Sequence, residues 1–355
     1  MPVQRLTRIA LTLALFASAL PLATAADSIP VRVHEIENQG AYNKRYSYFL
    51  VLLEHVLNAS CEECVIEKVA FPLATSTRNT VHLQKGRIDV AWINTNPARE
   101  KLLRPVRIPI YKGLIGWRLL LAREGTANKL RNVANLEQLQ TFWAGQGHDW
   151  PDTPILKSAG LQVRTSDSWE GIIHLLQQER IDYFPRGLNE IIYEAQTLRH
   201  QGIVIEHSLA LHYPAAVYFY VAKDNQVLAQ RLEAGFETII KNGEFDRLFH
   251  HFFGADIREA HLETKRIIEL KNPNLPPLTP LSRTELWFTP ANVVTSNVVT
   301  SKAVTSNPVT SNAVTLKAGA AKAVASDTYS ESLPEAASAG PASAPPENAA
   351  PPEPQ

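Results

Sequence analysis

The sequence has few cysteines, only Cys61 and Cys64 among 355 residues, and no surplus of either charge, with 35 basic and 35 acidic side chains. Proteins that bind nucleic acid usually carry a basic surplus, so the balanced charge gives no support for that class of partner. No hydrophobic run after the N-terminal segment reaches the roughly twenty residues that span a bilayer. The composition, 45% hydrophobic and 20% charged, is that of a globular chain with one large or two modest cores.

The two cysteines stand in the segment SCEEC. The N-terminal segment, described below, predicts export, and the oxidising compartment that an exported protein meets favours a disulfide. A thioredoxin-type redox pair sits at a helix N-terminus, whereas this pair follows a predicted helix. The neighbouring Glu62 and Glu63 also disfavour a thiolate. A metal site would lack its other ligands. We therefore predict a structural disulfide between Cys61 and Cys64, with no metal site and no cofactor.

The N-terminal segment has the pattern of a secretory signal peptide. Two arginines precede an apolar run at 9–22, and ATAAD follows with small residues at A-x-A spacing. The run is too short for a membrane anchor, and the residue after the small-residue site is not the cysteine that a lipid anchor needs. We predict that residues 1–25 are removed, by cleavage after Ala25 or Ala26, and that the mature protein is soluble and periplasmic or secreted.

The C-terminal part changes in composition near Asn272. Residues 271–290 include the proline-rich NPNLPPLTP, and a five-residue repeat, VVTSN VVTSK AVTSN PVTSN AVTLK, begins at Val293. After Phe288 the only aromatic residue is Tyr329. Such a segment buries too little apolar area to offset chain entropy, and a solenoid of so few short repeats has little core. We predict a proline-rich linker at 271–290 and a disordered tail at 291–355.

Two eight-residue segments are nearly the same, LQKGRIDV at 83–90 and LQQERIDY at 176–183. Each copy ends a stretch with helical spacing and then enters an apolar strand through Arg-Ile-Asp. Alternating helix and strand signals of this kind predict βαβ units and parallel sheets. Two similar α/β units in one chain predict a cleft between them, where a ligand can bind.

The order of motifs resembles the extracellular solute-binding proteins of the polar amino-acid type (family three), the substrate-binding parts of bacterial ABC importers. The motifs are an export signal, a strand and long helix, TRNTVHLQKGRIDVAWI, NPAREKLLRPVRIPIYKG, GQGHDWPDTPILKSAG, ERIDYFPRG and IIKNGEFDRLFHHFFG. The resemblance implies an α/β fold of the periplasmic-binding-protein-like type II, with two lobes joined by two crossover strands. Lobe 1 would comprise 26–116 and 214–270, and lobe 2 would comprise 117–213.

The resemblance also implies binding residues in the first lobe. In the family, an arginine after the Ile-Asp strand clamps the ligand carboxylate, and Arg99 is the matching residue. Arg104 is a rival because the spacing from Asp89 is short, and a solvated helix arginine is the alternative. The family's aromatic pair after the first strand is missing. Its nearest replacements are Glu37, Tyr42 and Trp92, for which core or surface packing is the alternative.

In the second lobe the loop GQGHDWPD corresponds to a loop that presents backbone amides to the ligand. Gln146 and Gly147 fit that role, since glycine permits close approach of a ligand. His148, Asp149 and Trp150 are further candidates for the cleft wall. As alternatives, Asp149 or Asp152 is only a helix cap and Trp150 packs within the lobe.

The family's aspartate for the ligand's ammonium group is absent here, and Arg186 stands near its place. An arginine prefers an anionic partner, which predicts a small polar, anionic ligand. Glu190 is the residue that would replace the aspartate by reaching back.

The function expected from these features is capture of a small polar ligand, such as an amino acid or organic acid, by hinge closure. A monomer would present it to a membrane partner such as an ABC importer. A sensory or scaffold protein with the same module is the alternative. An enzyme is not expected, because the sequence has no G-x-S-x-G, H-E-x-x-H or phosphate-loop motif, and its late histidines lack metal-ligand spacing.

Overall fold

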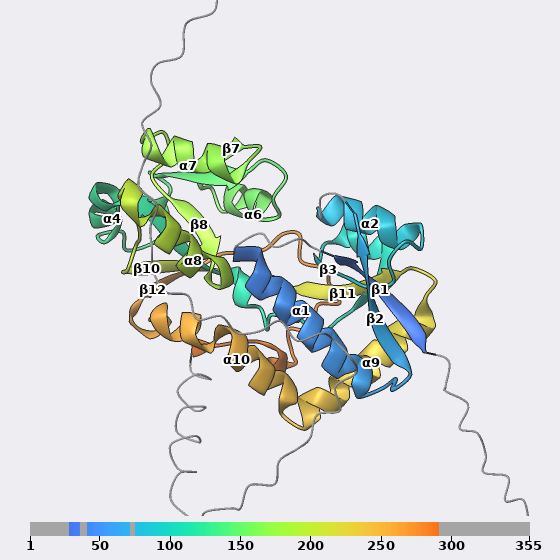
Figure 1. Cartoon of the computed structure of the whole chain (residues 1–355). Coiled ribbons are helices and arrows are strands. Elements are labelled where there is room, and N and C mark those ends of the chain that lie inside the picture. Colours follow the sequence, from blue (N-terminus) through green and yellow to red (C-terminus); the bar gives the residue numbers. More distant parts are fainter. Residues whose placement is uncertain (1–27, 36–40, 72–74, 291–355) are drawn as a thin grey trace, which may run out of the picture. The chain divides into compact units, whose positions relative to one another are not determined.

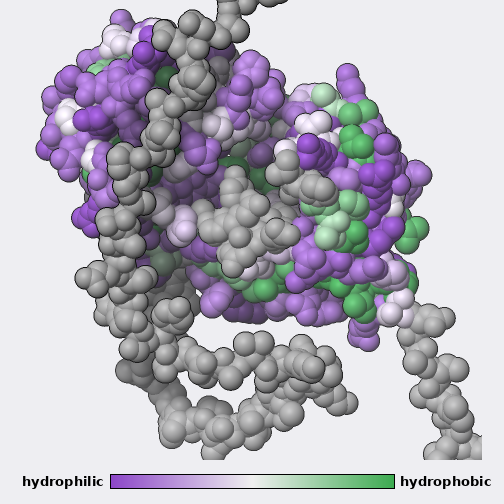
Figure 2. Space-filling model, turned by 45° about the horizontal axis from the view of Figure 1, so that its top comes forward, coloured by the Kyte–Doolittle hydropathy of each residue, from purple (hydrophilic) through white to green (hydrophobic). Residues whose placement is uncertain are grey.

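The structure is a computed structural model that describes residues 28–35, 41–71 and 75–290, without the side chains of 41–43. The predicted signal peptide and the predicted tail lie outside the described residues. Within those residues no helix has both the length and the apolar content that a bilayer span requires. On the face drawn in Figure 2 the coloured surface is mainly hydrophilic, and hydrophobic residues appear there in smaller groups.

The first lobe combines a parallel strand pair with an antiparallel sheet (Figure 1). In the pair, β1 (Ile29–Glu35) and β2 (Cys64–Ala70) run parallel. In the sheet, β11 (Val217–Ala222) lies between β3 (Ala91–Asn94) and β4 (Leu103–Val106). The helices of this lobe are α1 (Ala41–Asn58), α2 (Ser76–Gln84), α3 (Pro97–Leu102), α9 (Gln226–Lys241) and α10 (Glu244–Glu259). Of these, α1, α9 and α10 pack against one another.

The second lobe contains a five-stranded sheet and a second parallel pair. The sheet has the order β12-β10-β5-β8, and β9 also pairs with β5. Its strands are β5 (Trp117–Arg123), β8 (Phe184–Gly187), β9 (Ile203–Ile205), β10 (Leu209–His212) and β12 (Arg266–Glu269). The pair consists of β6 (Trp143–Gly147) and β7 (Gln162–Ser166). The helices are α4 (Glu124–Leu130), α5 (Leu136–Leu139), α6 (Asp152–Ser158), α7 (Trp169–Gln177) and α8 (Leu188–Leu198).

Short 3-10 turns complete the chain, at η1 (Leu114–Gly116), η2 (Arg199–Gln201), η3 (Leu262–Thr264) and η4 (Thr284–Leu286). The largest hydrophobic cluster includes buried residues of both lobes, from Phe49 and Phe253 to Ile172 and Ile191. Full burial of each such side chain stabilises the fold by roughly 1.5 to 3 kcal/mol. The predicted α/β class with two lobes is confirmed.

The predicted parallel pairing holds for only part of the structure. The pairs β1–β2, β6–β7 and β10–β12 are parallel, but β5 and β11 are antiparallel to every strand they pair with. Each of these two strands follows a crossing of the chain from one lobe to the other. Every antiparallel pair therefore involves a strand that follows a crossing.

The chain passes from the first lobe to the second at residues 107–117, the first crossing, and returns at residues 212–217, the second crossing. The two crossings touch each other at Gly116 and Tyr213. The amide of Tyr213 donates to the Gly116 carbonyl at 3.2 Å, and Trp117 stacks on His212 with ring centroids 4.1 Å apart. A Cβ on Gly116 would lie 2.1 Å from the Tyr213 carbonyl oxygen, so no larger residue fits without moving the backbone. Residues 266–269, assigned from sequence to the first lobe, pair with β10 in the second. A four-residue strand carries no local sign of which sheet it will join.

The two Arg-Ile-Asp segments have the same hydrogen bonds in the two lobes. The amides of Asp89 and Val90 both donate to the Arg32 carbonyl, at 2.7 and 3.2 Å, and the Arg32 amide donates to the Asp89 carboxylate at 2.8 Å. In the second lobe the amides of Asp182 and Tyr183 donate to the Trp143 carbonyl at the same distances, and the Trp143 amide donates to the Asp182 carboxylate at 2.7 Å. Each aspartate therefore attaches its segment to a neighbouring strand, which is β1 in the first lobe and β6 in the second.

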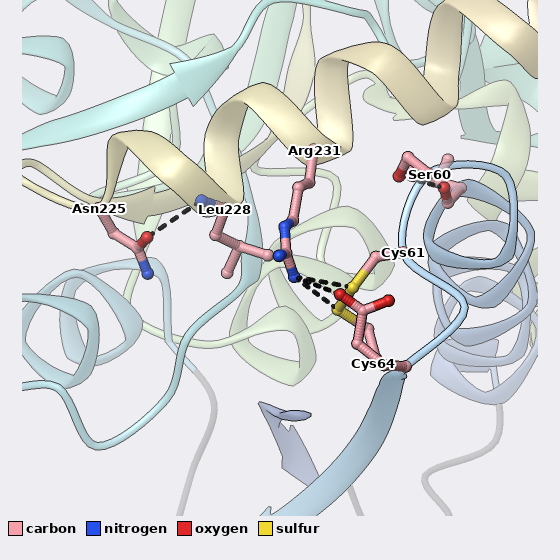
Figure 3. Close-up of a disulfide and its surroundings, with 8 residues drawn as sticks. Ser60, Cys61, Cys64, Asn225, Leu228 and Arg231 are labelled. Atoms are coloured by element: carbon pink, nitrogen blue, oxygen red, sulfur yellow. Dashed lines mark hydrogen bonds and ion pairs between the residues drawn. A yellow bond between two sulfur atoms is a disulfide. The ribbon is translucent and has the colours of Figure 1, made fainter. Parts of the chain in front are cut away.

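A disulfide joins Cys61 and Cys64 in the turn between α1 and β2 (Figure 3). The Cys61 amide donates to the Leu57 carbonyl at 2.6 Å, so the turn continues directly from the helix. From α9, Arg231 places Nη1 2.9 Å from the Cys61 sulfur and 3.3 Å from a carboxylate oxygen of Glu63. Both cysteines are buried, and the bridge fixes the angle between α1 and β2.

Candidate functional site

A group of charged side chains is buried where β8 ends and α8 begins. Arg118, on the neighbouring strand β5, pairs with Gly187 at this junction. We name six residues the α8 cluster: Arg45, Arg118, Asp152, Arg186, Glu190 and Glu194. Five of them have side chains no more than 10% exposed, and that of Arg45 is 13% exposed. Charges buried to this degree require partners, and the cluster consists of such partners.

Glu190 is the centre of the α8 cluster. Its carboxylate accepts a hydrogen bond from the Gly187 amide at 3.2 Å and lies 3.2 Å from Nη2 of Arg186. Nη1 of Arg118 is 3.7 Å away, and Nη1 of Arg45 is 2.5 Å away. Because Arg45 belongs to α1, this carboxylate joins a helix of the first lobe to one of the second.

The ionisation of Glu190 follows from these neighbours. Burial alone raises the pKa of this carboxyl, but the positive charges of Arg186, Arg45 and Arg118 outweigh burial and hold the pKa at about 2. Glu190 is therefore a carboxylate at neutral pH. It is available to a cationic group as well as to the three arginines.

Arg186 is held by Glu194 and by two aromatic rings. Its Nε and Nη2 donate to the two carboxylate oxygens of Glu194 at 2.7 and 2.6 Å, a bidentate arrangement. Its guanidinium carbon lies 4.9 Å from the ring centroid of Trp150 and 5.0 Å from that of Phe184. An anionic ligand at Arg186 would therefore share a guanidinium that already has a carboxylate partner.

Asp152 connects the cluster to both crossings. Arg118, two residues after η1, donates from Nη2 to Oδ1 of Asp152 at 2.6 Å. The hydroxyl of Tyr213, in the second crossing, donates to the same oxygen. Burial raises the pKa of Tyr213, so its hydroxyl keeps its proton. A rotation at either crossing would change the geometry around Asp152.

Several buried polar atoms around the cluster have no hydrogen-bond partner among the described residues. They are Oε1 of Gln146, both amide atoms of Asn189, Nε of Arg118 and the hydroxyl of Tyr111. Both Gln146 and Asn189 have relative exposures below 10%. An unsatisfied buried polar atom costs about 1 to 3 kcal/mol, so native proteins contain few of them. These atoms can bind a polar ligand without first breaking an internal hydrogen bond.

The predicted loop of the second lobe divides into an inward and an outward part. Gln146 donates to the Pro185 carbonyl at 3.3 Å, and Trp150 lies beside Arg186. Gly147 packs against the Trp150 ring, where a Cβ would lie 2.4 Å from ring atoms. The side chains of His148 and Asp149 are 68% and 95% exposed. The structure thus brings three of the five predicted loop residues to the cluster and leaves two at the surface.

The predicted residues of the first lobe lie in other surroundings. Arg99 donates to the Asn94 carbonyl within its own lobe, and burial lowers its pKa. Its rival Arg104 donates to the Lys223 carbonyl at 3.2 Å. The ring of Trp92 packs against that of Phe49, with centroids 3.9 Å apart and planes tilted by 31°, which is core packing. The hydrogen bonds of Arg99 and Arg104 and the ring contact between Trp92 and Phe49 all lie within the first lobe, away from the charged partners of the α8 cluster.

Two further predictions cannot be placed. Glu37 lies outside the described residues, and Tyr42 is in the first turn of α1, where side chains are not described. The described residues contain no group of three or more histidine, cysteine or acidic side chains arranged to hold a metal ion.

Sequence reasoning missed several residues of the site, above all Arg118, Asp152 and Asn189. One local signal was present for Arg118, a single charge inside the apolar strand WRLLLA, because such a charge is buried only with a partner. The sequence predicts Asp152 only as a helix cap. The structure instead places Pro151 at the cap and directs Asp152 toward Arg118.

Comparison with known proteins gives structural similarity only. No family model matches the chain, and no curated protein matches it. An ancestral arginine-binding protein bound to arginine is similar at 18% identity and a TM-score of 0.44, covering 58% of this chain and 88% of that one. The Bordetella pertussis BvgS periplasmic VFT2 domain is similar at 16% identity and a TM-score of 0.48, covering 63% of this chain and 93% of that one. The substrate-binding protein AbpA of an amino acid ABC transporter from Streptococcus pneumoniae, bound to L-arginine, is similar at 15% identity and a TM-score of 0.43, covering 59% of this chain and 84% of that one.

We transfer no residue role from these proteins at such identities and scores. A histidine kinase sensor domain with similarity to periplasmic binding proteins is also among the similar structures.

Proposed function

We propose that the protein captures a small polar ligand at the α8 cluster, between its two lobes, and is an exported solute-binding protein that presents this ligand to a membrane partner such as an ABC importer. The observation that carries the proposal is the set of buried, unpartnered polar atoms around Glu190. Of the residues with such atoms, Tyr111 belongs to the first lobe, while Arg118, Gln146 and Asn189 belong to the second. Arg45, which pairs with Glu190, also belongs to the first lobe. A ligand that contacts residues of both lobes favours the closed arrangement of the lobes.

The charges of the cluster limit the chemistry of this ligand. Three arginines and three carboxylates of the described residues balance one another. A buried ligand with a net charge would leave that charge uncompensated, at a cost of several kcal/mol. We therefore narrow the expected anionic ligand to one whose carboxylate is accompanied by a cationic group, as in an amino acid. Its carboxylate would share Arg118 and Arg186, and its ammonium group would share Glu190.

Binding is the role that the charges of the α8 cluster support. The pKa of Glu190 is held at about 2, so this carboxylate stays ionised and suits the binding of a cationic group. A sensory module would use the same capture and closure with a different membrane partner.

A ligand screen with one variant and one control tests the proposal. The screen measures the melting temperature and calorimetric affinity of the exported protein with the twenty amino acids, small organic acids and dipeptides. Asn189→Ala removes an amide whose two polar atoms are buried without a partner. We expect it to weaken the bound ligand at least tenfold and to raise the unfolding free energy of the ligand-free protein by about 1 kcal/mol.

The control is Asn128→Ala, which alters an exposed asparagine on α4 of the same lobe. It should change neither quantity. The proposal fails if no compound in the screen binds, or if the bound compound has the same affinity for the Asn189→Ala protein as for the unaltered one.

A further inference from the structure

The first crossing holds an unfavourable backbone conformation at Lys112. Lys112 has φ of 48° and the following Gly113 has φ of 70°. A lysine with positive φ costs about 1 to 2 kcal/mol relative to its usual conformations. Its side chain is 7% exposed, and its ammonium group contacts the Asp246 carboxylate of α10 and donates to the Glu285 carbonyl at 2.6 Å. These contacts keep the crossing in this conformation.

The chain after α10 returns to the second lobe and follows the second crossing. β12 pairs with β10, and the Leu270 amide donates to the His212 carbonyl at 2.8 Å. Next, Nδ2 of Asn272 donates to the Pro214 carbonyl at 2.9 Å. This segment therefore binds the backbone of the second crossing at two successive points.

The same segment then reaches the first crossing. The Phe288 amide donates to the Lys112 carbonyl at 2.7 Å. The Trp287 ring covers Gly113, where a Cβ would lie 2.5 Å from a ring carbon. Its indole nitrogen donates to the Pro280 carbonyl at 2.9 Å, which fixes the ring in this position. Only glycine at 113 allows this contact.

Both lobes hold this segment through side chains as well. Nζ of Lys265 donates to the His207 carbonyl of the second lobe at 2.7 Å. Two guanidinium nitrogens of Arg283 bind both carboxylate oxygens of Glu237 on α9, in the first lobe, at 2.6 and 3.0 Å. Residues 265–288, which we name the hinge strap, are thus attached to both lobes and to both crossings.

We propose that the hinge strap is a third connection between the lobes, which limits how far they open. Hinge motion changes φ and ψ at a few residues of the crossings. A change at Lys112 or Gly113 would break the contacts of Trp287, Phe288 and Glu285 with the first crossing. The strap therefore opposes opening in the absence of any ligand. This inference concerns the ligand-free protein, so its failure and the failure of the proposed binding function are separate results.

The test measures a distance between the lobes in the full, ligand-free protein. Spin labels are attached at Lys85→Cys and Lys157→Cys, both exposed positions, one in each lobe, while the two native cysteines stay in their disulfide. Pulsed electron resonance then gives the distribution of label distances. We expect Trp287→Ala to widen this distribution at least twofold and to extend it to longer distances.

A second variant and a control keep the test decisive if Trp287→Ala unfolds. Lys112→Met removes the contacts with Asp246 and Glu285 but keeps a side chain of similar length, and it should widen the distribution in the same direction. Leu278→Ser changes a strap residue that is 67% exposed and should leave the distribution unaltered. Unchanged distributions in folded Trp287→Ala or Lys112→Met protein overturn the proposal.

Discussion

The two Arg-Ile-Asp segments have the same hydrogen bonds in their two lobes and then lead into unlike surroundings. After the first, the chain enters β3, where Trp92 packs in an aromatic core. After the second, it enters β8 and reaches Arg186 and the buried charges of the α8 cluster. The repeated phrase therefore fastens a strand to its sheet, and the chemistry of each lobe depends on the residues that come later.

A second difference lies inside the repeat itself. The helix that precedes each Arg-Ile-Asp ends in a left-handed residue, which is Gly86 with φ of 60° in the first copy and Glu179 with φ of 55° in the second. Glycine adopts this conformation without steric cost, and glutamate does not. The helix end thus forms with either residue, but the glutamate raises the conformational free energy of the folded protein and the glycine does not.

The largest expected effect separates the surroundings of the two copies. Glu190→Ala leaves three buried arginines without their shared carboxylate, and we expect the unfolding free energy to fall by about 3 to 5 kcal/mol. Arg99→Ala, in the corresponding region of the first lobe, removes one hydrogen bond to a carbonyl and should cost about 1 kcal/mol. Urea unfolding of both variants measures this contrast. Equal losses would mean that the two regions do not differ as described.

The pH dependence of stability should come from the same carboxylate. The pKa of Glu190 is about 2 in the folded protein, below its usual value of 4.5. Its contribution is therefore present above about pH 4.5 and is lost as the pH falls toward 2. Urea midpoints between pH 6 and pH 2 should fall more steeply for the unaltered protein than for Glu190→Ala. Parallel curves would contradict this origin.

Loss of the aspartate carboxylate should lower the unfolding free energy by similar amounts at Asp89 in the first lobe and at Asp182 in the second. Asp182→Ala leaves the Trp143 amide without its acceptor, and Asp89→Ala does the same to Arg32. We expect each to lower the unfolding free energy by about 2 kcal/mol. Asp89 also pairs with the Arg32 guanidinium, whose side chain is 37% exposed, so its loss should exceed the other by at most about 1 kcal/mol. A negligible cost at either aspartate would show that the two anchors are not equivalent.

The smallest effects should have opposite signs in the two copies. Gly86→Ala meets no neighbouring atom within 4 Å, so its expected cost of about 1 kcal/mol is the backbone strain alone. Glu179→Gly relieves that strain and should stabilise the protein by about 0.5 to 1 kcal/mol. Glu179→Gln is its control, since it removes the exposed ion pair with Arg123 and leaves the backbone strain in place. Thermal unfolding distinguishes all three, and destabilisation by Glu179→Gly would refute the comparison.

Local patterns in the sequence predicted the fold better than the site. The α/β class followed from the spacing of apolar and turn residues. The role of the loop around Gln146 came from the family resemblance, and the structure places Gln146 itself in β6. The partners of Arg118 and Glu190 could not be predicted from local patterns. Arg45, a partner of Glu190, lies 145 residues away from it in the sequence. Periodicity indicates that a strand is buried but not which distant charge will face it. The pairing of β12 with β10 was missed for the same reason.

The most direct test of the central claim is the distance between the lobes with and without ligand. The protein labelled at Lys85→Cys and Lys157→Cys is measured alone and at saturation with the compound that raises its melting temperature most. The account predicts that the distance distribution becomes shorter and narrower on binding. A saturating ligand that leaves the distribution unchanged would contradict capture by closure of two lobes.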